Sequence, residues 1–357
     1  MRVAAYTGGQ NTPSARMRVR QYGPPLKSYG IDLREYTLSL GKSMPADAWK
    51  RPFWAAKTVV ERAISIPASY RADLTLISRN LMPGFLPGDR WTASPRVLDV
   101  DDAIWLNRGG HRAGPLAASC ELVLCGNSFL AEYYSKWNRN VAIVPTTVDT
   151  SLVHPAEPDE REIDLVIGWT GTSGNFRYLY EIGDALQRVF HRHPKARLRI
   201  IADTPPQFRQ LDASRVDFVR WSAEVERSEL QKFSVGIMPL RDTPWERGKC
   251  AFKMLLYMAS GLPVVVSPVG MNRDVLAKGE CGFRASTQEE WADALDLLLS
   301  SPSLARRMGM AGRAIAVQSF SVQSVAPVLA QYLTSVVSTP QSDLGLALGS
   351  TREEKVK

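Results

Sequence analysis

Residues 253–270 read KMLLYMASGLPVVVSPVG, and this stretch decides the fold class. Its first part completes an apolar helix predicted over residues 250–260, and Gly261 with Pro263 ends that helix. The three valines that come next predict a fully buried strand over residues 263–267, of the kind found in parallel sheets. A helix that leads directly into such a strand indicates an α/β domain.

Helices and strands alternate on both sides of this stretch. In the second half we predict strands over residues 165–169, 197–202, 216–218, 235–238 and 263–267, and helices over residues 178–191, 228–232, 250–260, 271–277, 288–300 and 302–318. In the first half we predict strands over residues 2–6, 31–36, 74–78, 96–99, 122–125 and 141–144, and helices over residues 14–29, 49–65, 128–137 and from residue 116. This alternation predicts parallel sheets covered on both faces.

The two series are separated by a polar segment, DTSLVHPAEPDEREI at residues 149–163, which we interpret as a linker. The expected architecture is α/β, with two Rossmann-like, doubly wound domains and a ligand cleft between them. We place the first domain at residues 1–155 and expect a C-terminal helix near residues 320–337 to return to it. The second domain spans residues 156–319. We expect the polar tail at residues 338–357 to be disordered.

Composition excludes several classes of protein. With 45% hydrophobic and 22% charged residues, the 357-residue chain is neither wholly disordered nor collagen-like. It has no run of 18 uncharged apolar residues, and its start, MRVAAYTGGQ, lacks the apolar region of a signal peptide, so we expect a cytoplasmic protein. The cysteines and histidines show no metal-ligand spacing and form no triad, so we expect no metal and no bound cofactor.

The charge is uneven along the chain. Residues 1–155 contain 19 Lys and Arg and 12 Asp and Glu, a surplus of +7 out of the total of +8. Such a surplus suits nucleic acid, an anionic membrane surface or a phosphorylated substrate. The cations are dispersed and no nucleic-acid-binding motif is present, so nucleic acid is the least favoured of the three.

Two loops after predicted strands of the second half are candidates for binding an anion. The first, GWTGTSGN at residues 168–175, is small, rich in hydroxyl groups and followed by a helix, although an ordinary strand–helix turn would have the same composition. The second, WERGKCAFK at residues 245–253, brings three cations to the start of a helix, where they oppose the helix dipole unless an anion lies between them. A solvated basic face is the alternative.

The stretch at residues 253–270 resembles the donor-site helix and strand of retaining glycosyltransferases of the GT-B fold, in the family known as family 4 or group 1. Residues 282–283, 289–299 and 308–313 resemble the region after that strand in the same family. Residues 14–18, 79–80, 97–105 (VLDVDDAIW), 126–131 and 144–149 (VPTTVD) resemble a bacterial subgroup that makes surface polysaccharides. The resemblance covers residues 1–335 in the family's order.

The family's signature of two glutamates separated by seven residues is absent, since Gly248 and Leu256 occupy those positions. Glu246, two residues earlier than the first, is a candidate substitute. The family's Arg and Lys pair after the first strand of the second domain is also missing. The resemblance then implies a donor site formed by Thr170, Gly171, Thr172, Ser173, Asn175, Arg247, Lys249, Lys253 and Gly270.

In the first domain, Asp101 and Asp102 are candidates for a catalytic base or for orienting the acceptor, and a helix-capping turn is the alternative. Arg16, Arg18, Arg79 and Asn127 are candidates for contact with the acceptor or with phosphate groups, and ion pairs between the arginines and the acidic cluster are the alternative. The sequence WKRPFWAAK at residues 49–57 interleaves cations with large aromatics. It suits a helix at an anionic membrane surface, or a core helix with a basic edge.

The resemblance thus implies a retaining, metal-independent glycosyltransferase. Its partners would be a nucleotide-sugar donor and a glycan or polyprenyl-diphosphate-linked acceptor, and it would act in the cytoplasm or at the inner face of the membrane. Two alternatives are a non-catalytic protein that binds sugar nucleotides, favoured by the missing glutamates, and a GT-B epimerase acting on a UDP-sugar. The epimerase would need cleft histidines, and none here falls in a matching motif.

Overall fold

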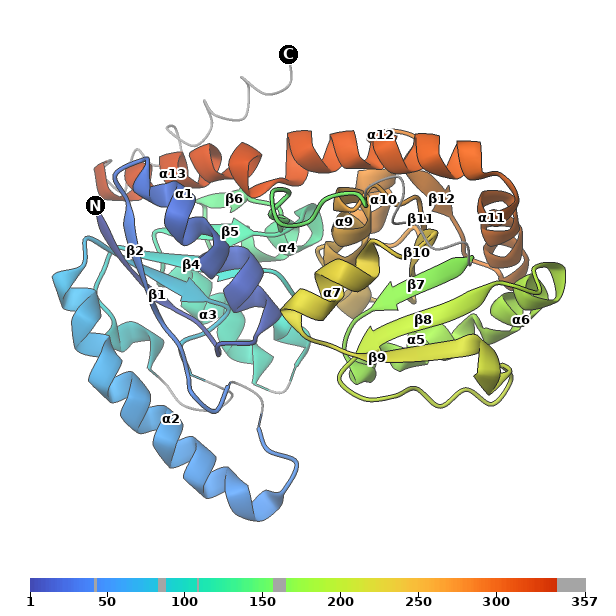
Figure 1. The fold of residues 1–357 in the computed structure, drawn as a ribbon. Helices are drawn as coiled ribbons and strands as arrows, with labels where there is room; N and C mark the ends of the chain where they lie inside the picture. The colour runs from blue at the N-terminus through green and yellow to red at the C-terminus, as the bar shows by residue number, and fades with distance from the viewer. Residues whose placement is uncertain (42–43, 83–87, 108, 157–164, 339–357) are drawn as a thin grey trace. The chain divides into compact units, whose positions relative to one another are not determined.

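The computed structural model describes residues 1–41, 44–82, 88–107, 109–156 and 165–338. The chain forms two compact units (Figure 1). The first contains residues 1–147, 248–250 and 322–357, and the second contains residues 148–247 and 251–321. The predicted tail lies outside the described residues, apart from residue 338.

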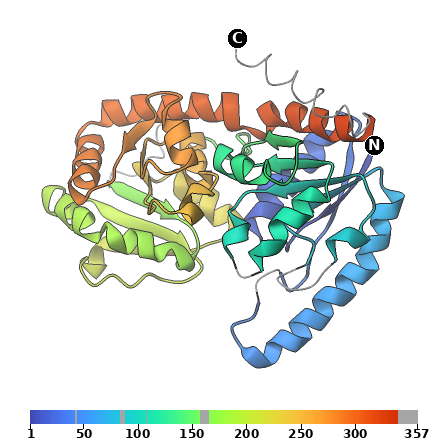
Figure 2. The same cartoon turned by 180° about the vertical axis from the view of Figure 1, so that it is seen from behind.

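The first unit is built on a parallel sheet of six strands in the order β2-β1-β3-β4-β5-β6. Its strands are β1 (Arg2–Tyr6), β2 (Asp32–Tyr36), β3 (Leu74–Ser78), β4 (Arg96–Val100), β5 (Leu122–Cys125) and β6 (Val141–Ile143). Its α-helices are α1 (Gly23–Lys27), α2 (Arg51–Ser65), α3 (Ala113–Ala118), α4 (Ser128–Tyr134) and α13 (Val322–Ser338). α13 packs beside α1 and buries Val325, Leu329 and Leu333 in the core of this unit. Helices α3 and α4 are at the front when the molecule is seen from behind (Figure 2).

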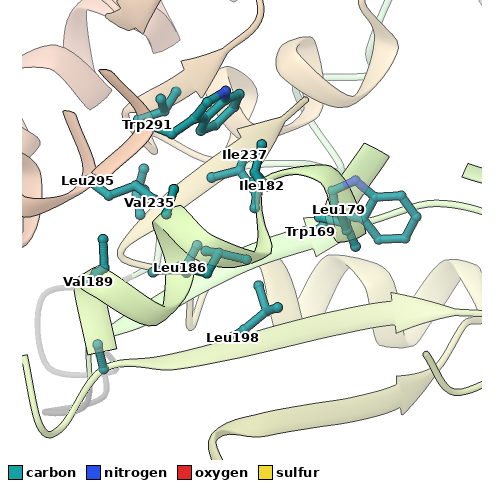
Figure 3. Packing of buried hydrophobic residues seen from close by; sticks show 14 of the residues in the cluster. Trp169, Leu179, Ile182, Leu186, Val189, Leu198, Val235, Ile237, Trp291 and Leu295 are labelled. Atoms are coloured by element: carbon teal, nitrogen blue, oxygen red, sulfur yellow. The ribbon is translucent and has the colours of Figure 1, made fainter. Parts of the chain in front are cut away.

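The second unit has the same plan, a parallel sheet in the order β12-β11-β10-β7-β8-β9. Its strands are β7 (Val166–Thr170), β8 (Arg197–Ala202), β9 (Val216–Arg220), β10 (Val235–Met238), β11 (Val264–Val266) and β12 (Gly282–Arg284). Its α-helices are α5 (Phe176–Glu181), α6 (Gly183–Arg192), α7 (Ala223–Leu230), α8 (Pro244–Arg247), α9 (Phe252–Ala259), α10 (Met271–Leu276), α11 (Gln288–Ser300) and α12 (Pro302–Phe320). Trp169, Leu186 and Leu295 lie in its main core (Figure 3). Two parallel six-stranded sheets confirm the predicted α/β, doubly wound fold class.

Several predicted helices differ from those observed. The helix predicted over residues 14–29 is three pieces, a π-helical turn (Ala15–Val19), a 3-10 turn (Arg20–Tyr22) and α1. Pro24 and Pro25 lie in the first turn of α1, where a missing N–H costs nothing, so they begin a helix rather than break one. The helix predicted over residues 178–191 is divided between α5 and α6, and the one predicted over residues 228–232 lies earlier, because Ser222 caps α7.

The predicted linker is not free along its described part. Arg313 of α12 donates to the carbonyl oxygens of Thr150 and Val153 at 2.8 and 2.6 Å, and Val148 N donates to Phe320 O at 2.9 Å. These bonds attach the start of the segment to the second unit. Its remainder, from residue 157, lies outside the described residues.

Candidate functional site

The predicted donor loop follows β7 and is held by two carboxylates. Thr170 Oγ1 donates to the buried Glu226 at 2.6 Å. Ser173 donates to Asp203 through both its backbone N–H, at 2.6 Å, and its hydroxyl, at 2.7 Å. Asn175 Nδ2 donates to Thr172 Oγ1 at 2.9 Å. Hydrogen bonds to Glu226 and Asp203 therefore fix the conformation of the loop, and the hydroxyls of Thr170 and Ser173 are used in these bonds.

Gly171 lies where a side chain has no room. A Cβ atom on this residue would come within 2.6 Å of Lys253 Cε and 2.7 Å of the Trp169 ring. The Lys253 ammonium lies over that ring, 4.8 Å from its centroid. Two residues predicted from separate motifs, Gly171 and Lys253, are thus in direct contact at the carboxyl end of β7.

Lys253 is in the first turn of α9, and the residue before the helix, Ala251, has a left-handed backbone with φ of 52°. A left-handed alanine is strained and is kept only where its surroundings enforce it. The strained residue fixes the direction in which α9 begins, so the cation is held at a helix N-terminus. Such an end attracts anions.

The other predicted donor residues of the second unit are more peripheral. Arg247 is exposed and pairs with Asp242, Nε to Oδ1 at 2.6 Å. Gly270 has a φ of 52°, and a Cβ there would lie 2.7 Å from the carbonyl oxygen of Arg247, so the chain needs glycine at this position. Lys249 belongs to the first compact unit. A shared role of Arg247, Lys249 and Lys253 in binding diphosphate stays a prediction.

Glu246 occupies a buried network in the second unit. Its carboxylate accepts hydrogen bonds from Tyr178 and Thr243, and Arg177 Nη2 lies 3.3 Å away. The Glu246 side chain is 3% exposed. Burial and the hydrogen bond to Glu246 raise the pKa of Tyr178 to about 12. Through these contacts Glu246 holds α8 against Tyr178 and Arg177 of α5. Its proposed catalytic role stays a prediction.

In the first unit, Asp101 and Asp102 share one arginine. Arg79 Nε lies 2.5 Å from Asp101 Oδ1, and its Nη2 lies 2.5 Å from Asp102 Oδ2. Arg79 has a left-handed backbone, with φ of 67°. Burial would lower the pKa of the Arg79 guanidinium, but the two carboxylates raise it. Burial raises the pKa of the Asp102 carboxyl, against the attraction of Arg79. Both predicted carboxylates are therefore oriented by a residue from the next strand end.

Arg18 is not at the surface, contrary to its predicted place in a cleft. Its side chain is 2% exposed, its Nη2 lies 2.5 Å from Asp99 Oδ1, and its Nη1 donates to Val144 O at 2.5 Å. A guanidinium buried in this way supports the ends of β4 and β6 and is not exposed to a ligand. Arg16, two residues earlier, is partly exposed.

Asn127 is the N-cap of α4, and its Oδ1 accepts from Leu130 N at 2.9 Å. Its Nδ2 donates to Lys249 O at 3.1 Å, while Cys250 Sγ lies 3.2 Å from Asp101 O. A Cβ on Gly126 would come within 2.3 Å of that sulfur. Residues 248–250 therefore dock on the ends of β4 and β5, next to Asp101.

The two positions of the missing glutamates have physical explanations. A Cβ on Gly248 would lie 2.7 Å from Ala103 Cβ, so a longer side chain does not fit. Leu256 is buried in α9 and is 4% exposed. Gly248 therefore has no room for a carboxylate, and Leu256 has no group that could accept a hydrogen bond from a ribose hydroxyl.

Sequence reasoning missed the residues that hold the site together. Glu226 and Asp203 fix the donor loop, and Arg177 and Tyr178 hold Glu246. Asp203 directly follows the strand predicted over residues 197–202, so the rule that located the donor loop applies to it as well. Glu226 and Tyr178 lie inside helices and give no such signal.

Among the described residues, no group of three or more His, Cys, Asp or Glu side chains is placed to hold a metal ion. None of the helices in that part of the chain is both long enough and apolar enough to cross a bilayer.

Known proteins resemble this chain in sequence over part of its length and in fold over nearly all of it. Residues 165–301 match the family model described as glycosyl transferases group 1. Sucrose-phosphate synthase from Thermosynechococcus elongatus is similar in structure, with a TM-score of 0.70 and 15% identity over 95% of this chain and all (100%) of that one. HepE from Anabaena, in complex with UDP-glucose, has a TM-score of 0.68 and 14% identity over 94% of this chain and 100% of its own.

WaaG, described as a glycosyltransferase involved in lipopolysaccharide biosynthesis, has a TM-score of 0.65 and 14% identity over 95% of this chain and 100% of its own. No curated protein matches the chain by sequence. The structural likenesses establish the GT-B fold, and the family match assigns residues 165–301 to the group 1 glycosyltransferases. The family match is thus confined to the part of the chain that carries the predicted donor loop, and the likeness over the whole chain is one of fold.

Proposed function

We propose that the protein transfers a sugar from a nucleotide-sugar donor, with retention of anomeric configuration and without a metal ion. The acceptor is a glycan or a polyprenyl-diphosphate-linked glycan of bacterial surface polysaccharide. The enzyme would act in the cytoplasm, at the inner face of the membrane. The donor binds to the second unit, the acceptor binds to the first, and no separate cofactor takes part.

One observation carries this proposal: the Lys253 ammonium is held beside Gly171 and over the Trp169 ring at the carboxyl end of β7. Ligands of open parallel sheets bind at this end of the strands. The glycine leaves room for the Lys253 side chain over the Trp169 ring, and the lysine supplies a fixed positive charge. A diphosphate is an anion that such a charge would bind.

The relatives supply the chemical class of the donor. HepE of Anabaena has been crystallised with UDP and with UDP-glucose. WaaG is described as acting in lipopolysaccharide biosynthesis. Each of them aligns with this chain over nearly its whole length, and they support a nucleotide-sugar donor and a surface-glycan acceptor.

Charge development explains why these residues would accelerate transfer. The bond between the anomeric carbon and the diphosphate oxygen breaks, so negative charge grows on the diphosphate while the sugar gains oxocarbenium character. A cation fixed beside the departing oxygens stabilises the transition state more than the ground state. The acceptor hydroxyl then bonds to the anomeric carbon, and Asp101 or Asp102, oriented by Arg79, is the candidate to orient that hydroxyl or accept its proton.

Transfer in the presence of EDTA tests the proposal. The full chain is incubated with common UDP-, GDP- and dTDP-sugars and a membrane-extracted lipid-linked acceptor, and the product is examined by proton NMR. We expect one donor to be consumed at an unchanged rate in EDTA, with the product anomer matching the donor. An inverted product, or loss of transfer that added Mg²⁺ restores, would contradict the mechanism. Donor binding with neither transfer nor hydrolysis would instead support the non-catalytic alternative.

A further inference from the structure

Helix α2 presents an apolar face to solvent. Phe53 is 68% exposed and Ile64 is 75% exposed, while Trp49, in the 3-10 turn Ala48–Lys50 just before the helix, is 77% exposed. Only Arg51 is charged among the exposed residues of the helix, which are Arg51, Pro52, Phe53, Ala56, Val59, Val60, Ala63 and Ile64. An exposed apolar surface of this extent marks an interaction site.

The rotation of α2 about its axis is fixed by its inward face. Trp54, Thr58 and Arg62 are buried. The Arg62 guanidinium donates to the carbonyl oxygens of Leu81 and Tyr36, each at 2.9 Å, and of Thr7 at 2.6 Å. Turning the apolar face inward would remove Arg62 from these three acceptors. The outward position of the apolar residues is therefore built into the fold.

The exposed residues form one continuous stripe. Trp49, Phe53, Val60 and Ile64 are separated by four, seven and four residues, which are the spacings of a single helix face. Ala56 and Ala63 lie between them. Figures 1 and 2 both draw α2 along the outside of the first unit. Thr58 and Arg62 are on the opposite, buried side, so the stripe is on the outward side of the helix.

Charges around the stripe favour an anionic partner. Besides the buried Arg62, residues 44–71 contain four basic residues (Lys50, Arg51, Lys57 and Arg71) and two acidic ones, Asp47 and Glu61. Lys50 pairs with Asp47 at 2.5 Å and Lys57 lies 3.9 Å from Glu61, which leaves a surplus of +2. Docking a second copy through the same face would bring these surplus cations together. An anionic surface would attract them, and it would also suit the surplus of +7 in residues 1–155.

Aromatic residues also occur at the far end of the helix. Tyr70 is 67% exposed and Trp91 is 55% exposed, and the Tyr70 hydroxyl donates to Trp91 O at 2.9 Å. Exposed tryptophan and tyrosine side chains are typical of proteins at the interface between lipid and water. Together with Trp49, they place exposed aromatic rings beyond both ends of α2.

We propose that α2 lies flat on an anionic lipid surface, with Phe53, Val60 and Ile64 inserted among the lipids and Lys50 and Lys57 at the head groups. This names the surface that would bring the enzyme to a lipid-linked acceptor. The biological role rests on the proposed function, but the binding itself does not need the donor or acceptor.

Sedimentation with lipid vesicles tests this surface. The full chain is mixed, without nucleotide-sugar, with vesicles of phosphatidylcholine alone or of phosphatidylcholine with phosphatidylglycerol. We expect binding to the anionic vesicles only. Phe53→Asp combined with Ile64→Asp should weaken it by roughly tenfold or more, because the inserted apolar area is lost. The matched control is Leu297→Asp combined with Val317→Asp, at residues 45% and 42% exposed on the second unit, and should bind as the unchanged chain does.

A second variant guards against misfolding. Lys50→Glu combined with Lys57→Glu alters side chains that are 49% and 40% exposed, and should also weaken binding to anionic vesicles. Failure of the unchanged chain to bind them, or equal binding to neutral vesicles, would overturn the proposal. So would a dimer in analytical ultracentrifugation that the Phe53→Asp and Ile64→Asp changes dissociate, since the stripe would then bind a second copy. Because no sugar is transferred in this assay, its failure is distinct from failure of the proposed function.

Discussion

Replacing Lys253 by alanine should weaken the binding of the donor's nucleoside diphosphate by about 10- to 150-fold, corresponding to roughly 1.5–3 kcal/mol. The substitution removes a charge-assisted contact with the diphosphate. The rate of transfer should fall as well, because the same cation stabilises the leaving group. Titration calorimetry with the preferred nucleotide measures the first effect, and steady-state kinetics measure the second.

Two further variants make this result specific. Gly171→Ala places a Cβ within 2.6 Å of Lys253 Cε, so it should displace the ammonium and weaken nucleotide binding without removing the charge. Lys232→Ala removes a lysine of the same unit that bonds to Glu229, and it should leave binding unchanged. Unchanged affinity and activity in Lys253→Ala would remove this residue from the donor site.

Arg18→Met should lower the free energy of unfolding of the first unit by about 3–5 kcal/mol. The change leaves Asp99 without its partner, and the side chains of Arg18 and Asp99 are only 2% and 5% exposed. A buried carboxylate that has lost its cation is among the most costly defects in a folded protein. Urea unfolding, followed by circular dichroism, measures the effect.

Arg20→Met is the matched control. Arg20 also pairs with a carboxylate, Glu35, but its side chain is 39% exposed, so the loss should stay below about 1 kcal/mol. Removing both buried charges, Arg18→Met with Asp99→Leu, should recover most of the lost stability. If Arg18→Met alone unfolds at the same urea concentration as the unchanged chain, the buried pair does not support the fold as described.

The strands were predictable because they are buried on both faces. Runs such as the three valines of β11 (Val264–Val266) have a strong apolar signal that helices on either side do not alter. β12 (Gly282–Arg284) is short, pairs only with β11 and ends in an exposed arginine, so its sequence gives no comparable signal. Helix ends were harder, since capping by residues such as Ser222 outweighs the apolar pattern.

The site was predictable where a residue lies just after a strand or in the first turn of a helix. Gly171 directly follows β7 and Lys253 lies in the first turn of α9, and the sequence next to each residue shows this. Arg18 and Asp99 are 81 residues apart, and Arg79 is 22 residues from Asp101, so their pairing depends on the order of strands in the sheet. The positions of Arg18 and Arg79 in the sequence do not show that Arg18 is buried while Arg79 is partly exposed.

Binding of nucleotides to the second unit tests the central claim most directly. The melting temperature of the full chain is measured with UDP, GDP, dTDP, CMP and their common sugars, and again with Lys253→Ala. A ligand that binds only the folded state raises the melting temperature by mass action. We predict a clear rise with one nucleotide and its sugars, reduced in Lys253→Ala. No rise with any of them, in a chain shown to be folded, would contradict the assignment of a donor site beside Gly171 and Lys253.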